Sequence, residues 1–203
     1  DPATGQVFRI NGAPLTFHKH QAQAIAKGQA GQSFVVTTGT GSGKSLCFFV
    51  PVVDAIIRAR RAGAARTTRA IIIYPMNALA NSQIKEIEKF ISQAGLPEEL
   101  RPVVRRYTGQ EGQQERLEIA SNPPDILLTN FMMAELLLTR QDDVDRRVID
   151  NARGLAFIVL DELHTYRGRQ GADVAVLVRR LRNRCSSGAD PLCIGTSATM
   201  ASE

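Results

Sequence analysis

The chain has 203 residues, 43% of them hydrophobic, and a formal net charge of +5. This length allows one large domain with a well-buried core, and the charge permits binding to a polyanion without requiring it. The three cysteines are scattered and lack C-x-x-C spacing, which argues against a disulfide framework and a zinc site. No apolar run approaches the roughly 18 residues that span a bilayer, and no signal pattern begins the chain, so we expect a soluble, cytoplasmic protein.

Residues 1–14 contain two glycines and two prolines. We therefore expect a turn-rich lead-in before a single folded domain that covers residues 15–203. The first expected helix is Leu15–Lys27, and it carries His20 and Gln21. An amide such as that of Gln21 donates and accepts hydrogen bonds at once, which suits the edge of an adenine base. A solvent-facing helix residue is the alternative interpretation of Gln21.

The stretch Thr37–Ser45 reads TTGTGSGKS and follows a short apolar run at 33–36 that is typical of a strand. Its three glycines allow backbone conformations that other residues avoid, so successive N–H groups can turn toward an anion. Lys44 supplies a positive charge for the β- and γ-phosphates of a nucleotide, and Ser45 supplies a hydroxyl for Mg²⁺. The stretch therefore predicts a phosphate-binding loop for ATP.

The usual form of this loop, G-x-x-x-x-G-K-[ST], has glycine where this chain has Thr38. A chance glycine-rich loop would imitate part of the pattern. The preceding strand and the following helix, expected at Leu46–Arg61, favour a true site, because a helix N-terminus attracts phosphates. The residues predicted to contact the nucleotide, besides Gln21, are Thr40, Gly41, Ser42, Gly43, Lys44 and Ser45.

Further apolar runs with the length of buried strands follow the loop. They are Ala70–Tyr74, Val103–Tyr107, Asp125–Thr129, Leu155–Leu160 and Leu192–Thr196. Helical patterns lie between most of them; one places Val174, Leu177, Val178 and Leu181 on a single helix face. Alternating strands and helices predict an α/β fold, with a mostly parallel sheet and helices on both faces.

Asp161 and Glu162 directly follow the strand expected at Leu155–Leu160. In a parallel sheet they would lie at the same edge as the phosphate loop. We expect Asp161 to share the metal with Ser45, and Glu162 to orient and deprotonate the attacking water. An acidic pair after a strand is weak evidence by itself, because such residues also begin loops and cap helices. Together with the loop it is strong.

Asp161-Glu162-Leu163-His164 resembles the DExH box of superfamily 2 helicases, and other segments resemble further motifs of that family in the expected order. These are Tyr74–Ala80 with Gln83 for motif Ia, Tyr107–Gly109 for the next short element, Thr129–Asn130 with Met132–Leu138 for motif Ib, Ser197–Thr199 for motif III, and His20–Gln21 for the adenine-reading position. The resemblance spans roughly residues 15 to 200. With the segment Leu177–Leu181, the motif sequences are most similar to those of the Lhr/MrfA-like DNA helicase branch.

This resemblance implies a RecA-like domain that binds ATP and Mg²⁺, the first half of a two-domain motor. It implies an ATP-dependent helicase or translocase that moves 3′ to 5′ on nucleic acid, DNA more than RNA, along a single-stranded track. Nothing in the 203 residues resembles the second RecA-like domain or its motif VI arginines. We therefore expect the chain to be a fragment of a longer protein with further domains.

The resemblance also implies a nucleic-acid track at the sheet edge. Its predicted residues are Pro75, Asn77, Ala78, Thr108, Gly109, Thr129 and Asn130. Their hydroxyl, amide and backbone N–H groups can bond phosphate oxygens, which positions a strand without reading its sequence. Structural roles are the alternative, since Asn77 can cap a helix and Thr129 can merely end a strand. The arginines at 179, 180, 182 and 184 form either a solvated face or a contact with DNA or another domain.

Motif III is predicted to couple hydrolysis to movement. The hydroxyls of Ser197 and Thr199 suit a hydrogen-bond link with His164 that changes when the γ-phosphate leaves. The alternative is that these hydroxyls only satisfy buried backbone groups at the end of a strand.

Three other functions are alternatives to a helicase. A phosphotransferase with the same loop has no need of motif III or of Tyr74–Gln83. A non-catalytic, nucleotide-dependent nucleic-acid binding module would be favoured had Lys44 or Glu162 been lost, and both are present. A double-stranded DNA translocase of a restriction or phage-defence system, without strand separation, stays open.

Overall fold

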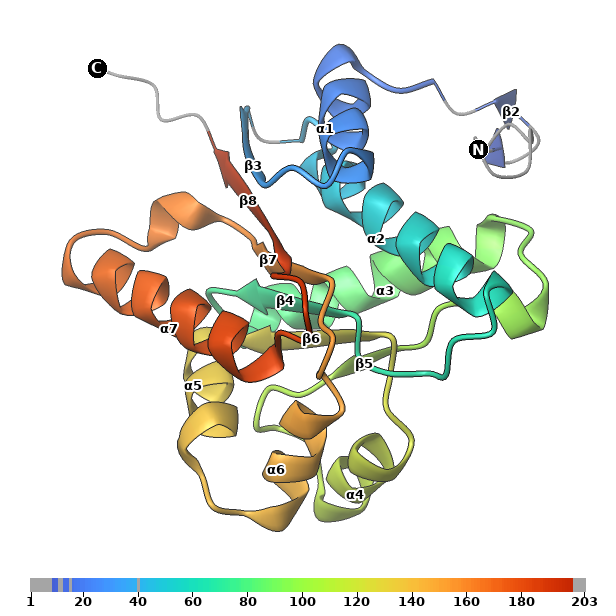
Figure 1. Ribbon diagram of the computed structural model, residues 1–203. Helices are drawn as coiled ribbons and strands as arrows, with labels where there is room; N and C mark the ends of the chain where they lie inside the picture. Colours follow the sequence, from blue (N-terminus) through green and yellow to red (C-terminus); the bar gives the residue numbers. More distant parts are fainter. Residues whose placement is uncertain (1–8, 11–12, 15, 40, 199–203) are drawn as a thin grey trace.

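The computed structural model describes residues 9–10, 13–14, 16–39 and 41–198 (Figure 1). Within that part, six strands form one sheet in the order β3-β8-β7-β4-β6-β5. The strands are β3 Phe34–Thr38, β4 Ala70–Tyr74, β5 Val104–Arg106, β6 Ile126–Asn130, β7 Phe157–Leu160 and β8 Leu192–Ala198. Every pairing in this sheet is parallel. The predicted α/β class with a parallel sheet is confirmed.

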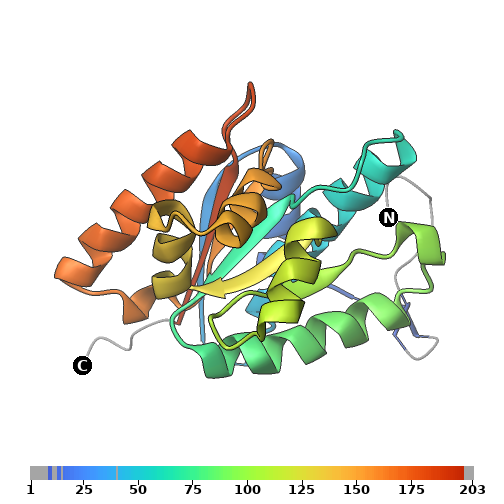
Figure 2. The same cartoon turned by 90° about the horizontal axis from the view of Figure 1, so that it is seen from below.

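Helices cover both faces of the sheet, as predicted. They are α1 Lys19–Gln29, α2 Lys44–Arg61, α3 Asn77–Gln93, α4 Gln113–Ser121, α5 Phe131–Thr139, α6 Asp143–Asp150 and α7 Arg169–Cys185, with short 3₁₀ turns η1 Glu98–Leu100 and η2 Leu163–Thr165. Figure 2 shows α2 and α3 on one side of the sheet, and α5, α6 and α7 on the other. Each layer has its own apolar core against the sheet.

The central strand β4 is apolar throughout because both of its faces are buried. Ile71 and Ile73 belong to the core under α4–α7, whereas Ala70, Ile72 and Tyr74 belong to the core under α2 and α3. All five side chains are at most 1% exposed. A strand buried on both faces cannot alternate apolar and polar residues, so it reads as a continuous apolar run.

The boundaries of β4 match the prediction, and those of α1 do not. The structure starts α1 at Lys19, four residues after the predicted Leu15. His18 has an extended backbone and its N–H donates to Gln21 Oε1 at 2.9 Å, so it precedes the helix as a cap. The lead-in contains an antiparallel pair of two-residue strands, β1 Arg9–Ile10 and β2 Ala13–Pro14, that the turn signals did not predict.

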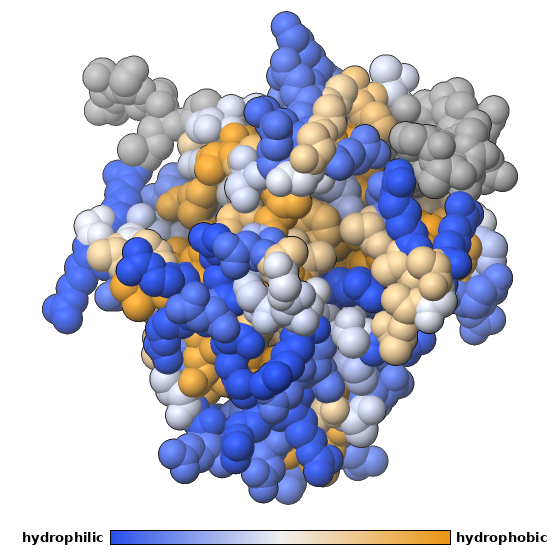
Figure 3. Space-filling model, viewed as in Figure 1, coloured by the Kyte–Doolittle hydropathy of each residue, from blue (hydrophilic) through white to orange (hydrophobic). Residues whose placement is uncertain are grey.

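The surface is largely polar on the face drawn in Figure 3, where hydrophilic residues surround smaller hydrophobic areas. Exposed large apolar side chains are scattered among the described residues; they are Val35, Met76, Leu117, Met132 and Val176. Within the part of the chain that the structure describes, no helix is both long enough and apolar enough to cross a membrane.

The contact between α1 and α2 generates a stability prediction. A Cβ atom added at Gly28 of α1 would lie 2.7 Å from the Cβ of Pro51 in α2. Glycine to alanine normally stabilises a helix interior by about 1 kcal/mol, but overpacking costs about 1–3 kcal/mol. We expect Gly28→Ala to lower the melting temperature of the chain, measured by circular dichroism. A raised melting temperature would show that α1 and α2 do not pack this closely.

Candidate nucleotide site and nucleic-acid edge

The parallel register brings the predicted nucleotide-binding elements together. Thr38 at the end of β3 pairs with Ala198, and Leu160 at the end of β7 pairs with Gly195 of the same strand, β8. The loops that follow β3 and β7 therefore leave the sheet at one edge, two strands apart. A hollow of about 330 Å³ lies there, lined by Gly41, Ser42, Gly43, Lys44, Ser45, Leu79, Gln83, Asp161 and Glu162.

Two glycines give the phosphate loop its shape. Gly41 has φ 75° and Gly43 has φ 69°, a left-handed backbone that residues with a Cβ rarely adopt. A Cβ at Gly43 would also lie 2.6 Å from the side-chain nitrogen of Gln21. Gly43 immediately precedes α2, and it lines the hollow together with Lys44 and Ser45, the first residues of that helix. The first N–H groups of a helix have no partner within it. Thr40, also predicted in this loop, lies outside the described residues.

The structure explains how the loop tolerates Thr38 in place of glycine. Thr38 is the last residue of β3, and its backbone is not left-handed. Its hydroxyl hydrogen-bonds to the hydroxyl of Ser42 at 2.6 Å, which closes the loop from within. The Lys44 ammonium donates to the carbonyls of Thr38 and Gly39, both at 3.2 Å, and the residue is only 9% exposed. Position 38 does not require glycine, because its backbone is extended and the Thr38 hydroxyl bonds to Ser42.

Helix α1 holds the phosphate loop through two neighbouring residues. A ring nitrogen of His20 lies 3.1 Å from the carbonyl of Ser42, and the Gln21 amide donates to the carbonyl of Gly43 at 3.1 Å. Gln21 is 3% exposed, so the solvent-facing interpretation is wrong. Its amide already serves the loop and the cap at His18, and its contact with adenine stays a prediction.

Asp161 is buried at the end of β7 beside a threonine that sequence reasoning missed. It is 7% exposed, and its Oδ1 accepts from the Thr196 hydroxyl and from the Glu162 N–H at 3.1 Å. Burial raises the pKa of the Asp161 carboxyl, the Thr196 hydrogen bond opposes this, and the charge of Glu162 adds to it. The only sequence signal for Thr196 is its place directly before motif III.

Glu162 has an unusual backbone for its residue type. With φ 54° and ψ 47°, it is the one left-handed residue other than glycine in the described chain. Such a conformation costs on the order of 1–3 kcal/mol and is concentrated at functional sites. Its Oε2 is buried without a hydrogen bond, yet lies 3.1 Å from His164 Nδ1. The short distance is not a hydrogen bond, because His164 Nδ1 accepts one from the Ala198 N–H and so has no proton to donate to Glu162.

The link between motif III and His164 runs through the backbone. The N–H of Ala198 donates to His164 Nδ1 at 3.2 Å, whereas the Ser197 hydroxyl donates to the Ala198 carbonyl. The expected bond from Ser197 to His164 is therefore wrong. Successive side chains of a strand point to opposite faces, and Thr196 already faces Asp161, so Ser197 faces away from it. Thr199 lies outside the described residues, and the coupling role stays a prediction.

Comparison with known proteins decides the family. The profile of the DEAD/DEAH box helicases matches residues 18–203. The chain belongs to the DEAD/DEAH box helicase family. This confirms the resemblance read from the DExH box and its companion motifs.

Relatives of this helicase chain belong to the Lhr/MrfA-like group. The ATP-dependent helicase YprA of Bacillus subtilis is 32% identical over 91% of this chain and 23% of its own length. Lhr helicase/uracil glycosylase of Escherichia coli is 32% identical over 83% of the chain and 11% of its own. The chain thus spans under a quarter of the length of these relatives.

Solved structures support the fold. The DUF1998 helicase MrfA bound to DNA and AMPPNP has a TM-score of 0.75 at 33% identity, over 91% of this chain and 24% of that one. Lhr of Mycobacterium smegmatis, bound to ssDNA and AMP-PNP, has a TM-score of 0.74 at 24% identity, over 91% and 23% of the two chains. The second likeness is one of fold alone.

In this helicase chain, part of the predicted nucleic-acid track is built into the protein interior. Thr129 is 0% exposed and its hydroxyl donates to the Tyr107 carbonyl at 2.7 Å, so a side-chain contact with a strand is wrong for Thr129. Asn130 caps α5 by accepting from the Met133 N–H at 2.7 Å, and its amide donates to Thr108 O and Asn77 Oδ1. The structural alternative holds for Thr129, and Asn130 has a structural role as well. The alternative for Asn77 is wrong, because Met76 precedes α3 as its cap and no side chain caps that helix.

The Thr108–Gly109 turn is occupied by a carboxylate that the sequence analysis did not single out. Glu111 accepts from the N–H groups of Thr108 and Gly109 at 2.7 and 2.9 Å, and from the Thr108 hydroxyl at 2.9 Å. These donors are therefore satisfied within the chain. The predicted track residues at the start of α3 are more accessible: Pro75 and Asn77 are half-buried, and Ala78 is exposed. Nucleic-acid contact stays a prediction.

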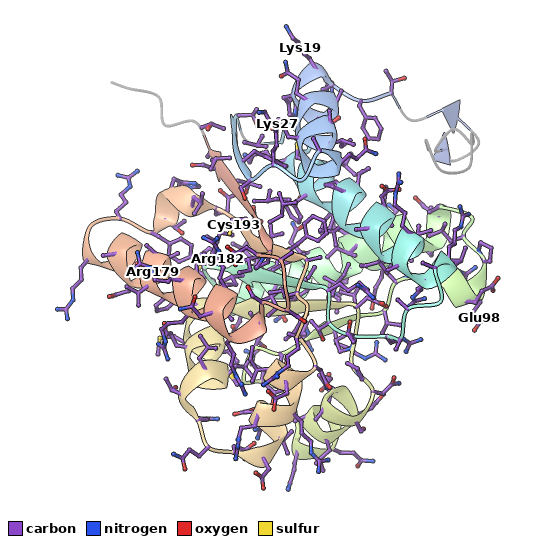
Figure 4. The ribbon with its side chains drawn as sticks, in the orientation of Figure 1. Lys19, Lys27, Glu98, Arg179, Arg182 and Cys193 are labelled. Atoms are coloured by element: carbon purple, nitrogen blue, oxygen red, sulfur yellow. The ribbon has the colours of Figure 1, made fainter. Side chains whose placement is uncertain are left out.

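The arginines of α7 are largely paired with acids. Arg180 forms an ion pair with Glu135, Arg182 with Asp190, and Arg184 with Asp150. Figure 4 shows Arg179 and Arg182 on this helix. The pairing favours the solvated-face interpretation for the three paired arginines.

The raised pKa of Asp161 generates a prediction about pH. Because its folded pKa lies above the unfolded value, the stability it contributes is present below the unfolded pKa and is lost as pH rises through the folded one. At pH 7 the ionised carboxylate therefore destabilises the fold. Asparagine can keep both bonds to Oδ1, so we expect Asp161→Asn to melt at a higher temperature than the parent at pH 7.

The difference in melting temperature should shrink toward zero as the pH falls below the ordinary range of a carboxyl group. Thermal unfolding of both proteins across a pH series measures it. A variant that is less stable than the parent at pH 7, or a difference that ignores pH, would contradict this description of Asp161.

Proposed function

We propose that the chain is the ATP-binding half of an ATP-dependent helicase or translocase that acts on nucleic acid, DNA more than RNA. The observation that carries the proposal is the hollow where the phosphate loop meets Asp161 and Glu162. The relatives named as ATP-dependent helicases, and the MrfA structure with DNA and AMPPNP, support it. We place the second RecA-like domain, with its transition-state arginines, elsewhere in a longer protein.

The residues around the hollow fit a magnesium–nucleotide complex. Ser45 and Asp161 offer hard oxygen ligands, which Mg²⁺ prefers, and both line the hollow. Among the described residues, no three His, Cys, Asp or Glu side chains gather into a metal site. A site with only Ser45 and Asp161 as protein ligands suits Mg²⁺. This ion usually retains several waters and is held by one or two protein groups together with phosphates. When bound, the metal would neutralise charge on the transferring phosphate.

Lys44 and Glu162 have separate tasks in this proposal. Lys44 moves from the loop carbonyls that it now contacts to the β- and γ-phosphate oxygens, which are stronger acceptors because they are charged. Glu162 has a buried oxygen without a hydrogen-bond partner, so it can accept one from a water aligned with the γ-phosphate and take its proton. Asp161, held by Thr196, keeps a fixed orientation throughout.

Nucleic acid would lie along the edge formed by the start of α3. Asn77 and the exposed Ala78 are the first residues of that helix, and no side chain caps it. Its first N–H groups are therefore open to phosphate oxygens, in the manner of other helix N-termini. Such contacts position a strand without reading its bases.

Two substitutions should produce different defects. Lys44→Ala removes the phosphate charge, so we expect it to abolish most nucleotide binding. Glu162→Gln keeps the shape and hydrogen bonding, so binding should persist while turnover stops in the longer, two-domain protein. Titration of a fluorescent ATP analogue and a phosphate-release assay measure the two effects. Lys89→Ala, on the exposed side of α3, is the matched control. Unchanged affinity in Lys44→Ala would rule out this site.

A phosphate-contacting edge predicts strong salt dependence and little sequence preference. The logarithm of the association constant for a single-stranded oligonucleotide should fall with the logarithm of salt concentration, by about 0.7 per phosphate contacted. Oligo-dT, oligo-dC and mixed sequences should bind within a few-fold of each other at constant salt. Fluorescence anisotropy measures both quantities. A strong preference for one sequence would indicate direct base readout instead.

A further inference from the structure

One residue of α3 contacts the phosphate loop directly. Gln83 lines the hollow together with Leu79, four residues earlier on the same helix face. The Ser45 hydroxyl donates a hydrogen bond to Gln83 Oε1 at 3.4 Å. Gln83 is half-buried, whereas Gln93 near the end of the same helix is exposed. The contact connects α3 with the first turn of α2.

The bond has a consequence for the proposed metal ligand. A serine hydroxyl has one proton to donate and two lone pairs to offer. With its proton directed to Gln83, Ser45 keeps its lone pairs available for a cation on the hollow side. Gln83 can therefore fix the orientation in which the hydroxyl binds metal, in the way that outer partners commonly orient metal ligands.

The start of α3 is tied to the predicted nucleic-acid edge. Asn77, its first residue, accepts a hydrogen bond from Asn130, whose amide also donates to the Thr108 carbonyl. Gln83 follows six residues later, about 9 Å along the helix at 1.5 Å per residue. Ala80 and Ile87 pack this stretch into the core at no more than 1% exposure. Because this stretch is helical and packed, a shift at Asn77 would carry Gln83 with it.

We propose that Gln83 is a positioning residue that connects the start of α3 to the metal-binding hydroxyl of Ser45. Binding of a strand at Asn77 and Ala78 seats α3, and Gln83 then holds Ser45 in its metal-binding orientation. Strand binding and Mg²⁺–nucleotide binding strengthen each other, and the coupling is the same in both directions. This inference rests on the proposed function, because it requires both ligands.

The test is a set of affinities measured on the 203-residue chain. A fluorescent, non-hydrolysable ATP analogue is titrated with and without Mg²⁺, and with and without a dT oligonucleotide. The variants are Gln83→Leu, which removes the acceptor, and Gln83→Glu, which keeps an acceptor at the same distance along the side chain. Gln93→Leu makes the Leu change at an exposed position of the same helix.

We expect Gln83→Leu to lose about fivefold of the affinity gained from Mg²⁺, roughly one hydrogen bond, together with the effect of the oligonucleotide. Its metal-free affinity should match the parent. Gln83→Glu keeps an acceptor for Ser45, so it should retain the gain from Mg²⁺ and the effect of the oligonucleotide, while its charge lowers the metal-free affinity. Gln93→Leu should behave as the parent. If Gln83→Leu does not fold, judged by thermal unfolding, Gln83→Met replaces it, because methionine keeps the length without a strong acceptor.

Two results would overturn the inference while leaving the proposed function intact. One is a leucine variant with the full gain from Mg²⁺ and the full effect of the oligonucleotide. The other is a parent chain that binds the analogue with Mg²⁺ but does not respond to the oligonucleotide. A parent chain that binds no analogue under any condition would instead overturn the proposed function, and this inference with it.

Discussion

The parallel register of β3, β8 and β7 is the constraint on which the site depends. Because β8 pairs with both neighbours, the loop after β3 and the acidic pair after β7 leave the sheet at the same edge. Thr196 of β8, between them, then meets Asp161 and the Glu162 N–H directly. Two apolar cores pack helices against the faces of this sheet and hold the register. The positions of the groups predicted to be catalytic therefore follow from strand pairing and apolar burial.

Hydrogen bonds within the chain already satisfy many polar groups of the site. Gln21 supports the phosphate loop, Glu111 occupies the Thr108–Gly109 turn, and Asn130 joins three segments. These bonds order the edge before any ligand arrives. Ordering these groups therefore adds less to the entropic cost of binding. Glu162 differs from them: its backbone is strained and one carboxylate oxygen has no hydrogen bond, as expected of a group kept for chemistry rather than for stability.

The fold class and the placement of Lys44 and Asp161 on one hollow could be predicted from the sequence, because glycine spacing and buried strands are local signals. The sequence did not predict which polar side chains turn inward. The sequence predicts a nucleic-acid contact for Thr129, yet its hydroxyl bonds to the Tyr107 carbonyl beside the neighbouring strand. It gives no signal for Glu111, whose carboxylate accepts from the Gly109 N–H. The direction of the Thr129 hydroxyl depends on the pairing of β5 with β6, whereas Glu111 bonds within its own turn, to residues two and three positions earlier. The start of α1 differs from the prediction because the side-chain Oε1 of Gln21 accepts from the His18 N–H, which makes His18 the N-cap.

The proposed function requires that one edge of the sheet bind a magnesium–nucleotide complex between the phosphate loop and the acidic pair. A crystal structure of the chain with Mg²⁺ and a non-hydrolysable ATP analogue tests it most directly. The proposed function predicts phosphates against the N–H groups from Gly41 to Lys44, and a metal that contacts Ser45 and Asp161. Phosphates bound away from this loop, or a metal that contacts neither residue, would contradict it.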